Sequence, residues 1–222
     1  MIVNLIQNSA LLISLSVLYG LIKWHKPQNE ILYQVSQGVW FGAVAIAAMM
    51  MPYAYSTGVI YDGRSVILTL AGLFGGGYTA LVSVLMAGAY RIYLGGSGIW
   101  AGLATILFCS LTGLFFRRLF KSKLENIQFV RFMVIGIIAH LVMLASQLLL
   151  PGNESYEVIS LIWLPVLLVL PITFAVIAKL FQLIVRYVKN EQKIREAETL
   201  YRTTLLSIGD AVICTDKKGN IS

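Results

Sequence analysis

The sequence predicts an all-α, polytopic transmembrane helical bundle with six or so membrane segments, and three observations support this fold class. Of the 222 residues, 58 % are hydrophobic and only 12 % are charged, and the mean hydropathy is +0.80, values outside the usual range of soluble domains. Most basic residues lie at or near the ends of the apolar runs. A helix needs about 20 apolar residues to cross a bilayer. Apolar runs occupy residues 2–22, 35–56, 65–90, 99–116, 127–150 and 156–185.

The basic residues indicate how this bundle is oriented. The loop at 117–123 carries four lysines and arginines, and residues 179–195 carry five more. Positively charged loops stay in the cytoplasm, so both regions, and the C-terminus with them, are predicted there. The loop at 151–157 has no basic residue and is predicted outside, which by counting back also places 91–98 and the N-terminus outside. The first run, 2–22, is expected to remain as a helix, because it lacks the basic start and cleavage site of a signal peptide.

The formal net charge of +7 does not indicate a nucleic-acid-binding protein. The basic residues lie where they set orientation and meet anionic lipid head groups. Cys109 lies inside an apolar run and Cys214 in the polar tail, so the two cysteines are expected on different sides of a membrane boundary and cannot form a disulfide. The sequence predicts no metal site, no cofactor and no catalytic residue.

Residues 64–94 are predicted to form a helical hairpin. Both ends of this segment must lie outside, yet it has only 31 residues, with Gly-Gly-Gly at 75–77. Glycine adopts turn geometry at low steric cost, so the tip of the hairpin is expected there. With a helix rise of about 1.5 Å per residue, Arg64 and Arg91 stand roughly 16 and 21 Å above the tip. The two arginines are therefore expected at similar depth, near the outer face.

Arg64 and Arg91 are candidates for an anion site. A charged side chain at the edge of the hydrocarbon is costly unless it meets a cavity, a partner or water, and the planar guanidinium matches a carboxylate with two hydrogen bonds. Asp62 is the only acidic residue between Glu30 and Arg117. A plainer interpretation is that Arg64 pairs with Asp62 and that both arginines extend to lipid phosphates.

The residues around both arginines resemble a known family. The strings "GVIYDGRSVILTLAGLFGG", "LMAGAYRIYLGGSGIWAGL" and "LFFRRLF" are similar to the LytS/YhcK-type five-transmembrane receptor (5TMR) domain, and the resemblance covers about residues 1–190. Members are N-terminal sensor modules of bacterial histidine kinases and diguanylate cyclases. The resemblance implies a multi-pass domain of the inner (cytoplasmic) membrane, with a fold like that of the substrate-binding subunits of vitamin transporters. In one branch, arginines matching Arg64 and Arg91 hold external pyruvate.

Other polar residues join the arginines as candidate ligand contacts. The pyruvate sensors add a cysteine and a hydroxyl residue from the next helix, and without a gap the matching positions here are Gly102 and Thr105. Thr105 and Cys109 share one helical face. His140, midway along its apolar run, is either such a contact or a hydrogen-bonded packing residue. The complete predicted ligand-binding set is Arg64, Arg91, Asp62, Ser65, Thr105, Cys109 and His140.

The polar tail predicts a signalling helix. Tyr187, Ile194, Tyr201 and Ile208 recur every seven residues, which indicates a short coiled coil and a homodimer. The alternative is an amphipathic helix that packs on its own domain. Pro171 is expected to bend the last span at a transmission point.

The end of the chain, "LYRTTLLSIGDAVICTDKKGNIS", resembles the opening of a PAS domain, with a helix, a strand, a glycine turn and a second strand. The predicted domains are therefore a transmembrane sensor at 1–186, a signalling helix at 187–208 and the beginning of a PAS domain at 209–222.

These features predict the membrane input domain of a two-component sensor histidine kinase. A small external carboxylate such as pyruvate would be its ligand, membrane lipid its surroundings, and a response regulator the partner of its kinase module. A diguanylate cyclase with the same sensor is an alternative. So are a solute-binding transporter subunit and a structural membrane protein whose arginines only contact lipid.

Overall fold

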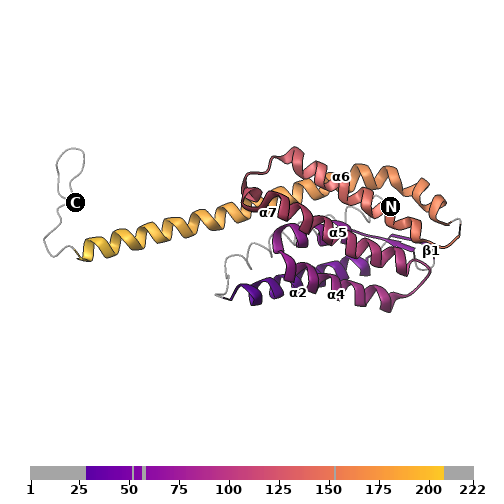
Figure 1. Cartoon of the computed structure of the whole chain (residues 1–222), viewed down its shortest axis with the longest axis horizontal. Helices are drawn as coiled ribbons and strands as arrows, with labels where there is room; N and C mark the ends of the chain where they lie inside the picture. The colour runs from indigo at the N-terminus through magenta and orange to yellow at the C-terminus, as the bar shows by residue number, and fades with distance from the viewer. Residues whose placement is uncertain (1–28, 52, 57–58, 153, 208–222) are drawn as a thin grey trace.

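The described part of the chain is a helical bundle with one long projecting helix (Figure 1). The computed structural model describes residues 29–51, 53–56, 59–152 and 154–207. In chain order the elements are α2 (Glu30–Met50), β1 (Tyr53–Ser56), β2 (Val59–Tyr61), α3 (Arg64–Leu70), the π-helix η1 (Ala71–Gly75), α4 (Gly77–Leu94), α5 (Ile99–Phe120), the 3-10 helix η2 (Lys121–Asn126), α6 (Phe129–Ser146), the 3-10 helix η3 (Gln147–Leu149) and α7 (Glu154–Ser207).

The predicted polytopic helical bundle is confirmed in its coarse form. Within the described residues, 4 helices are long and apolar enough to cross a membrane, namely α2, α5, α6 with η3, and α7. The apolar helix formed by α3 and η1 is shorter. The first predicted span, 2–22, and the predicted PAS start, 209–222, lie outside the described residues.

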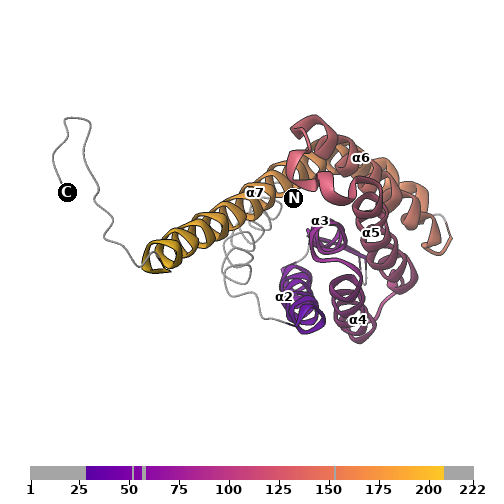
Figure 2. The same cartoon turned by 60° about the vertical axis from the view of Figure 1, so that its left-hand side comes forward.

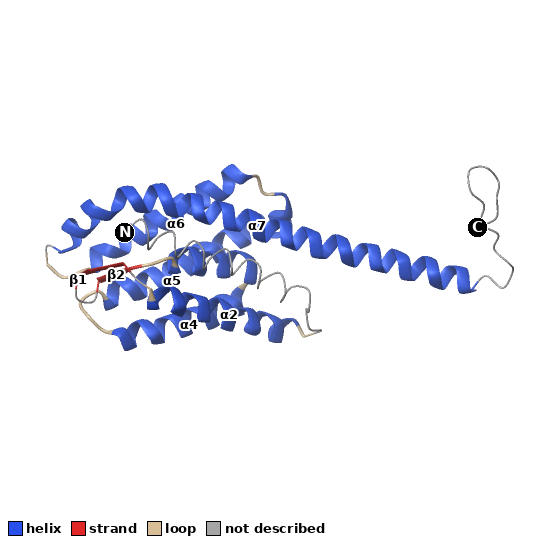
Figure 3. Cartoon of the chain, turned by 180° about the vertical axis from the view of Figure 1, so that it is seen from behind, coloured by secondary structure: helices blue, strands red, loops and turns tan. Residues whose placement is uncertain are grey.

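A small antiparallel hairpin of two strands, β1 and β2, lies between the helices α2 and α3 and was not predicted. Tyr53 pairs with Tyr61 in β1 and β2, at the end of the bundle opposite the projecting part of α7 (Figure 3). The predicted helix over 35–56 stops at Met50, and Pro52 follows it in the sequence, where the residue before a proline is disfavoured in a helix. The tyrosines, valine and isoleucine beyond it favour strands.

The predicted glycine-turned hairpin is confirmed. α3 continues into η1, the chain turns at Gly76 with φ 100°, and α4 runs back. Such a positive φ is open to glycine and strained for other residues. Every residue of α3 is buried, and Figure 2 shows α3 between the other helices. The first arm of the hairpin is therefore a core element, surrounded chiefly by α5, α2, α6 and α7, while α4 packs mainly on α2.

Two glycines allow α3 and α5 to cross in backbone contact. A Cβ on Gly113 of α5 would collide with the carbonyl oxygen of Thr69 and stand 2.9 Å from the backbone nitrogen of Leu73. A Cβ on Gly72 would collide with the carbonyl oxygen of Ser110. Small residues give membrane helices this close approach, which replaces the hydrophobic drive that is absent between helices in lipid.

Aromatic side chains join the tip of the hairpin to α6 and α7, and α2 to α7. The ring of Phe74 in η1 lies 5.4 Å from the ring of Phe181 in α7 and 6.3 Å from that of Phe132 in α6. Phe41 of α2 reaches the same Phe181 at 6.0 Å. The hairpin tip and the last helix thus share one packed core.

The outer surface is apolar as well. Leu85, Phe115, Val130 and Leu168 come from four different helices, and each exposes more than half of its surface. A soluble protein rarely exposes so large an apolar area. The finding fits helices that face lipid.

α7 is a continuous helix of 54 residues that passes through Pro165 and Pro171. Its first part packs on α6, and from Lys189 onward nearly all of its described side chains are exposed. No break separates the part of α7 that packs on α6 from residues 187–207. A movement of the packed part would therefore reach the exposed part along one continuous helix.

Candidate functional site

Asp62 and Arg64 form a buried ion pair at the start of α3. The carboxylate oxygen Oδ1 of Asp62 accepts a hydrogen bond of 2.9 Å from the backbone nitrogen of Arg64. Its Oδ2 lies 3.5 Å from the guanidinium Nη1 of Arg64, with both side chains buried. Asp62 thus accepts the backbone N–H at the start of α3 and also lies against the guanidinium of Arg64. This is the pairing that the plainer interpretation of the sequence expected.

Arg91, in the last turn of α4, is 1 % exposed. Its Nη1 donates a hydrogen bond of 2.7 Å to the carbonyl oxygen of Gly95. Arg91 is close enough to Arg64 and Asp62 for the charges of the three side chains to act on one another. The three side chains are buried, and together they form a cluster of two cations and one anion.

Gly102 of α5 makes room for Arg91. A Cβ at this position would collide with Nε of Arg91 and stand 3.0 Å from its Cδ. Gly102 is one of the two positions that match the family's additional ligand contacts when the sequences are aligned without a gap. Its part in this structure is to let the arginine stem lie flat on α5.

Replacing Gly102 by alanine is expected to displace the Arg91 side chain without removing its charge. For the carboxylate site proposed below, the affinity should fall by roughly tenfold or more, because a displacement of about 1 Å in a binding group is costly. Binding of pyruvate to the purified variant, measured by calorimetry, tests this. Gly88→Ala in α4, where the nearest atom would be 3.7 Å away, is the matched control and should bind as the wild type does.

Ser65 and His140 connect α3 to α6. The His140 Nε2 and the Ser65 Oγ are 3.2 Å apart, and the Nδ1 of His140 lies 2.7 Å from the carbonyl oxygen of Gly136. A carbonyl only accepts, so Nδ1 carries the proton, and Nε2 then accepts from the serine hydroxyl. Both side chains are buried. His140 therefore fits a neutral, fully hydrogen-bonded residue that links α3 to α6.

Thr105 and Cys109 lie on the buried face of α5, as predicted. The Thr105 hydroxyl donates to the carbonyl oxygen of Ala101 at 2.9 Å and accepts from the side-chain amide of Gln147 at 3.4 Å. The Cys109 thiol lies 3.7 Å from the carbonyl oxygen of Ala139. These contacts join α5 to η3 and α6. We call Thr105, Cys109 and Gln147, together with Ser65 and His140, the polar wall.

Two further polar residues of this region were missed. Thr69 is fully buried one turn after Ser65 and interacts with Cys109. Ser110 is buried beside Cys109, and its hydroxyl has no hydrogen-bond partner among the described residues. The signal for Thr69 was its i+4 spacing from Ser65. The described residues contain no cluster of histidine, cysteine and carboxylate side chains that could hold a metal ion.

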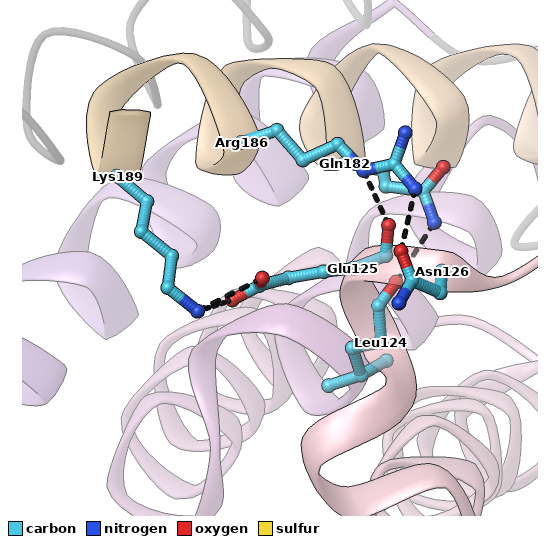
Figure 4. Close-up of polar contacts among 6 residues, drawn as sticks. All are labelled: Leu124, Glu125, Asn126, Gln182, Arg186 and Lys189. Carbon is cyan, nitrogen blue, oxygen red and sulfur yellow. Dashed lines mark hydrogen bonds and ion pairs between the residues drawn. The ribbon is translucent and has the colours of Figure 1, made fainter. Parts of the chain in front are cut away.

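A second group of polar contacts fastens α7 to the η2 turn at the other end of the bundle (Figure 4). The side-chain amide of Gln182 donates to the carbonyl oxygens of Leu124 at 2.8 Å and Ile127 at 3.0 Å. Lys189 forms an ion pair of 2.8 Å with Glu125, and Arg186 donates to the backbone carbonyl of Glu125. We call these contacts the α7 clamp. They hold α7 where it leaves the bundle.

The residues predicted to transmit a signal lie along α7: Pro171 before the clamp, Tyr187 within it, and Ile194 and Tyr201 beyond it. Pro171 is buried, and Gly136 of α6 approaches it so closely that a Cβ would stand 3.0 Å from its carbonyl oxygen. Tyr187, Ile194 and Tyr201 are 60 %, 63 % and 72 % exposed. The exposed heptad positions do not pack on their own domain within the described residues.

Comparison with known proteins places this arrangement in a family. A family model described as 5TMR of 5TMR-LYT matches residues 16–184. The sensor histidine kinase/phosphatase LytS of Staphylococcus aureus strains Mu50, N315 and MW2 is 25 % identical over 138 residues, which are 61 % of this chain and 23 % of each relative. The chain therefore matches less than a quarter of the length of these curated relatives. No solved structure matches the chain significantly.

The family model covers well over half of the chain and includes every residue of the buried charge cluster and the polar wall. The chain belongs to the family of 5TMR domains of the 5TMR-LYT type.

Proposed function

We propose that this domain is the membrane input module of a bacterial sensor histidine kinase and that it binds a small external carboxylate such as pyruvate beside Arg64 and Arg91. The observation that carries the proposal is the buried cluster of two guanidiniums and one carboxylate. Burying a net positive charge is costly. A monovalent anion of matching size offsets that cost.

The geometry favours an anion with a planar carboxylate. Asp62 already pairs with the guanidinium of Arg64, so the incoming carboxylate would bind chiefly to Arg91 and complete a ring of alternating charges. Hydrogen bonds between ionised groups contribute about 1.5 to 3 kcal/mol each. Thr105, Cys109 and the Ser65–His140 pair would then contact the remainder of a short ligand and exclude long ones.

The structure offers a route from this cluster to α7. Ser65 follows Arg64 directly and bonds to His140, which in turn bonds to the carbonyl oxygen of Gly136, and Gly136 lies against Pro171 of α7. A ligand that shifts the start of α3 would thus act on α7 through three successive contacts, two of which join different helices. The ligand favours one arrangement only to the extent that it binds that arrangement more tightly.

The rest of the proposal concerns the whole protein. The C-terminal end of α7 would lie in the cytoplasm, dimerise through its heptad positions and pass the signal to a PAS domain and a kinase module, with a response regulator as partner. The LytS relatives are sensor histidine kinases, and the exposed, continuous α7 supports this output path.

A panel of ligands tests the anion site. Purified protein in lipid nanodiscs is heated with pyruvate, other short keto acids, acetate and the neutral amide of pyruvate. A carboxylate at 100 times its Kd should stabilise the protein by about 2.7 kcal/mol, and the neutral amide should have no effect. Equal stabilisation by pyruvate and its amide, or none by any carboxylate, would contradict the proposal.

Cysteine cross-linking tests the dimeric signalling helix. Ile194→Cys, in a Cys214→Ser background with the buried Cys109 retained, should form a disulfide-linked dimer when oxidised in membranes. Thr199→Cys, at the opposite heptad face, should cross-link at least several-fold more slowly, because a parallel coiled coil turns that face outward. Equal rates at both positions would indicate random collision and contradict the dimer.

A further inference from the structure

A pocket of about 730 Å³ opens beside the tip of the α3–α4 hairpin, at the end of the bundle that carries the basic loop. It is separate from the buried charge cluster, which lies at the other end of α3. Its lining consists of Gly77, Leu111, Leu114, Phe115, Arg117, Arg118 and Leu124.

Two arginines at this pocket carry charges that no described acidic residue neutralises. Among the described residues, ion pairs join Asp62, Glu125 and Glu191 to Arg64, Lys189 and Arg195. Arg117 instead donates two hydrogen bonds through Nη1, to the carbonyl oxygens of Leu73 at 3.1 Å and Phe74 at 2.8 Å. Arg118 is exposed. Two arginines that line one pocket favour an anion with several oxygens, and phosphate is the commonest.

The remaining wall of the pocket is apolar and continues into the outer surface of α5. Leu111 is 46 % exposed and Phe115 is 63 % exposed, and both belong to a helix long and apolar enough to cross a membrane. The site thus combines cations near the end of a span with an apolar track toward the middle of the span. This is the chemistry of a phospholipid, with a phosphate at one end and acyl chains at the other.

We propose that this pocket, which we call the α5 lipid site, binds one anionic phospholipid. Its phosphate lies between Arg117 and Arg118, and an acyl chain runs along Leu111 and Phe115. Basic pockets between membrane helices are suited to anionic head groups. A zwitterionic lipid brings its own cation to the two arginines and binds less well.

The position of the site connects lipid to both ends of the signalling route. Arg117 holds the carbonyls that end η1, so a phosphate on Arg117 bears on the hairpin tip. Leu124 belongs to the η2 turn, and its carbonyl accepts the hydrogen bond from Gln182 in the α7 clamp. A bound lipid therefore contacts the hairpin and the turn that holds α7.

Native mass spectrometry of the protein released from nanodiscs tests the site. With equal amounts of phosphatidylglycerol and phosphatidylcholine, the wild type is expected to retain one phosphatidylglycerol in preference. Arg118→Gln should lower that retention by roughly fivefold, since one basic residue near the membrane surface contributes about 1 kcal/mol of attraction to anionic lipid. Arg118 makes no hydrogen bond to described residues that its replacement would break, so the variant should fold.

Two controls make the result decisive. Arg131→Gln removes an exposed charge from α6 outside the pocket and should leave retention unchanged, whereas Phe115→Ala should lower it for the loss of acyl contact. Equal losses for Arg118→Gln and Arg131→Gln would show diffuse attraction and overturn the proposal. So would equal retention of the two lipids, or displacement of the lipid by an equal concentration of free glycerol phosphate.

Discussion

Replacing Arg91 by methionine is expected to abolish carboxylate binding while leaving the protein folded. Losing one partner of a buried, hydrogen-bonded charge pair costs about 2 to 5 kcal/mol, which is a roughly thirtyfold or greater loss of affinity. Methionine keeps the unbranched stem that lies on Gly102. It also removes a buried cation, and exchanging a buried charge for an apolar side chain of similar size is often neutral or stabilising.

Calorimetric titration with the carboxylate that stabilises the wild type, together with the melting temperature of the ligand-free protein, separates binding from folding. Arg131→Met, at an exposed position of α6, is the matched control and should bind as the wild type does. Arg64→Met should also lose binding, but with a lower melting temperature, because it leaves Asp62 buried without its ion-pair partner. Affinity within about threefold of wild type for Arg91→Met, a change well below 1 kcal/mol, would refute the anion site.

Features fixed by local chemistry were predictable from the sequence. The turn at Gly76 follows from three glycines in the middle of an apolar segment that must return to its starting side. The equal depth of Arg64 and Arg91, expected from the helix rise on each side of that turn, stays a prediction. The pairing of Asp62 with Arg64 follows from their separation of two residues and from the scarcity of other acids nearby.

Contacts between helices were not predictable in the same way. In a membrane bundle both the core and the lipid-facing surface are apolar, so periodicity does not fix the rotation of a helix about its own axis. For this reason the partner of His140, which is Ser65, and that of Thr105, which is Gln147, needed the structure. The α7 clamp joins residues 58 positions apart, and nothing local marks Gln182 as a partner of Leu124.

The close crossing of α3 and α5 leads to the second large effect, a loss of stability in Gly113→Ala. In most helix interiors, alanine is more stable than glycine by roughly 0.5 to 1 kcal/mol. Here the new methyl group would collide with the carbonyl oxygen of Thr69, and backbone cannot rotate away as a side chain can. Overpacking of this kind costs about 1 to 3 kcal/mol, and the backbone contact places Gly113→Ala at the upper end.

Gly88→Ala provides the opposite case within the same fold. Gly88 also lies inside a helix, α4, but the nearest atom to its added Cβ would be 3.7 Å away, so the ordinary helix preference should prevail and the apparent melting temperature should stay equal or rise. In detergent-purified protein, Gly113→Ala should melt several degrees lower than wild type and Gly88→Ala should not. Thr69 lies one helical turn after Ser65 in α3. A forced separation of α3 from α5 at Thr69 should therefore also weaken carboxylate binding. A Gly113→Ala protein as stable as Gly88→Ala would show that α3 and α5 do not cross in backbone contact.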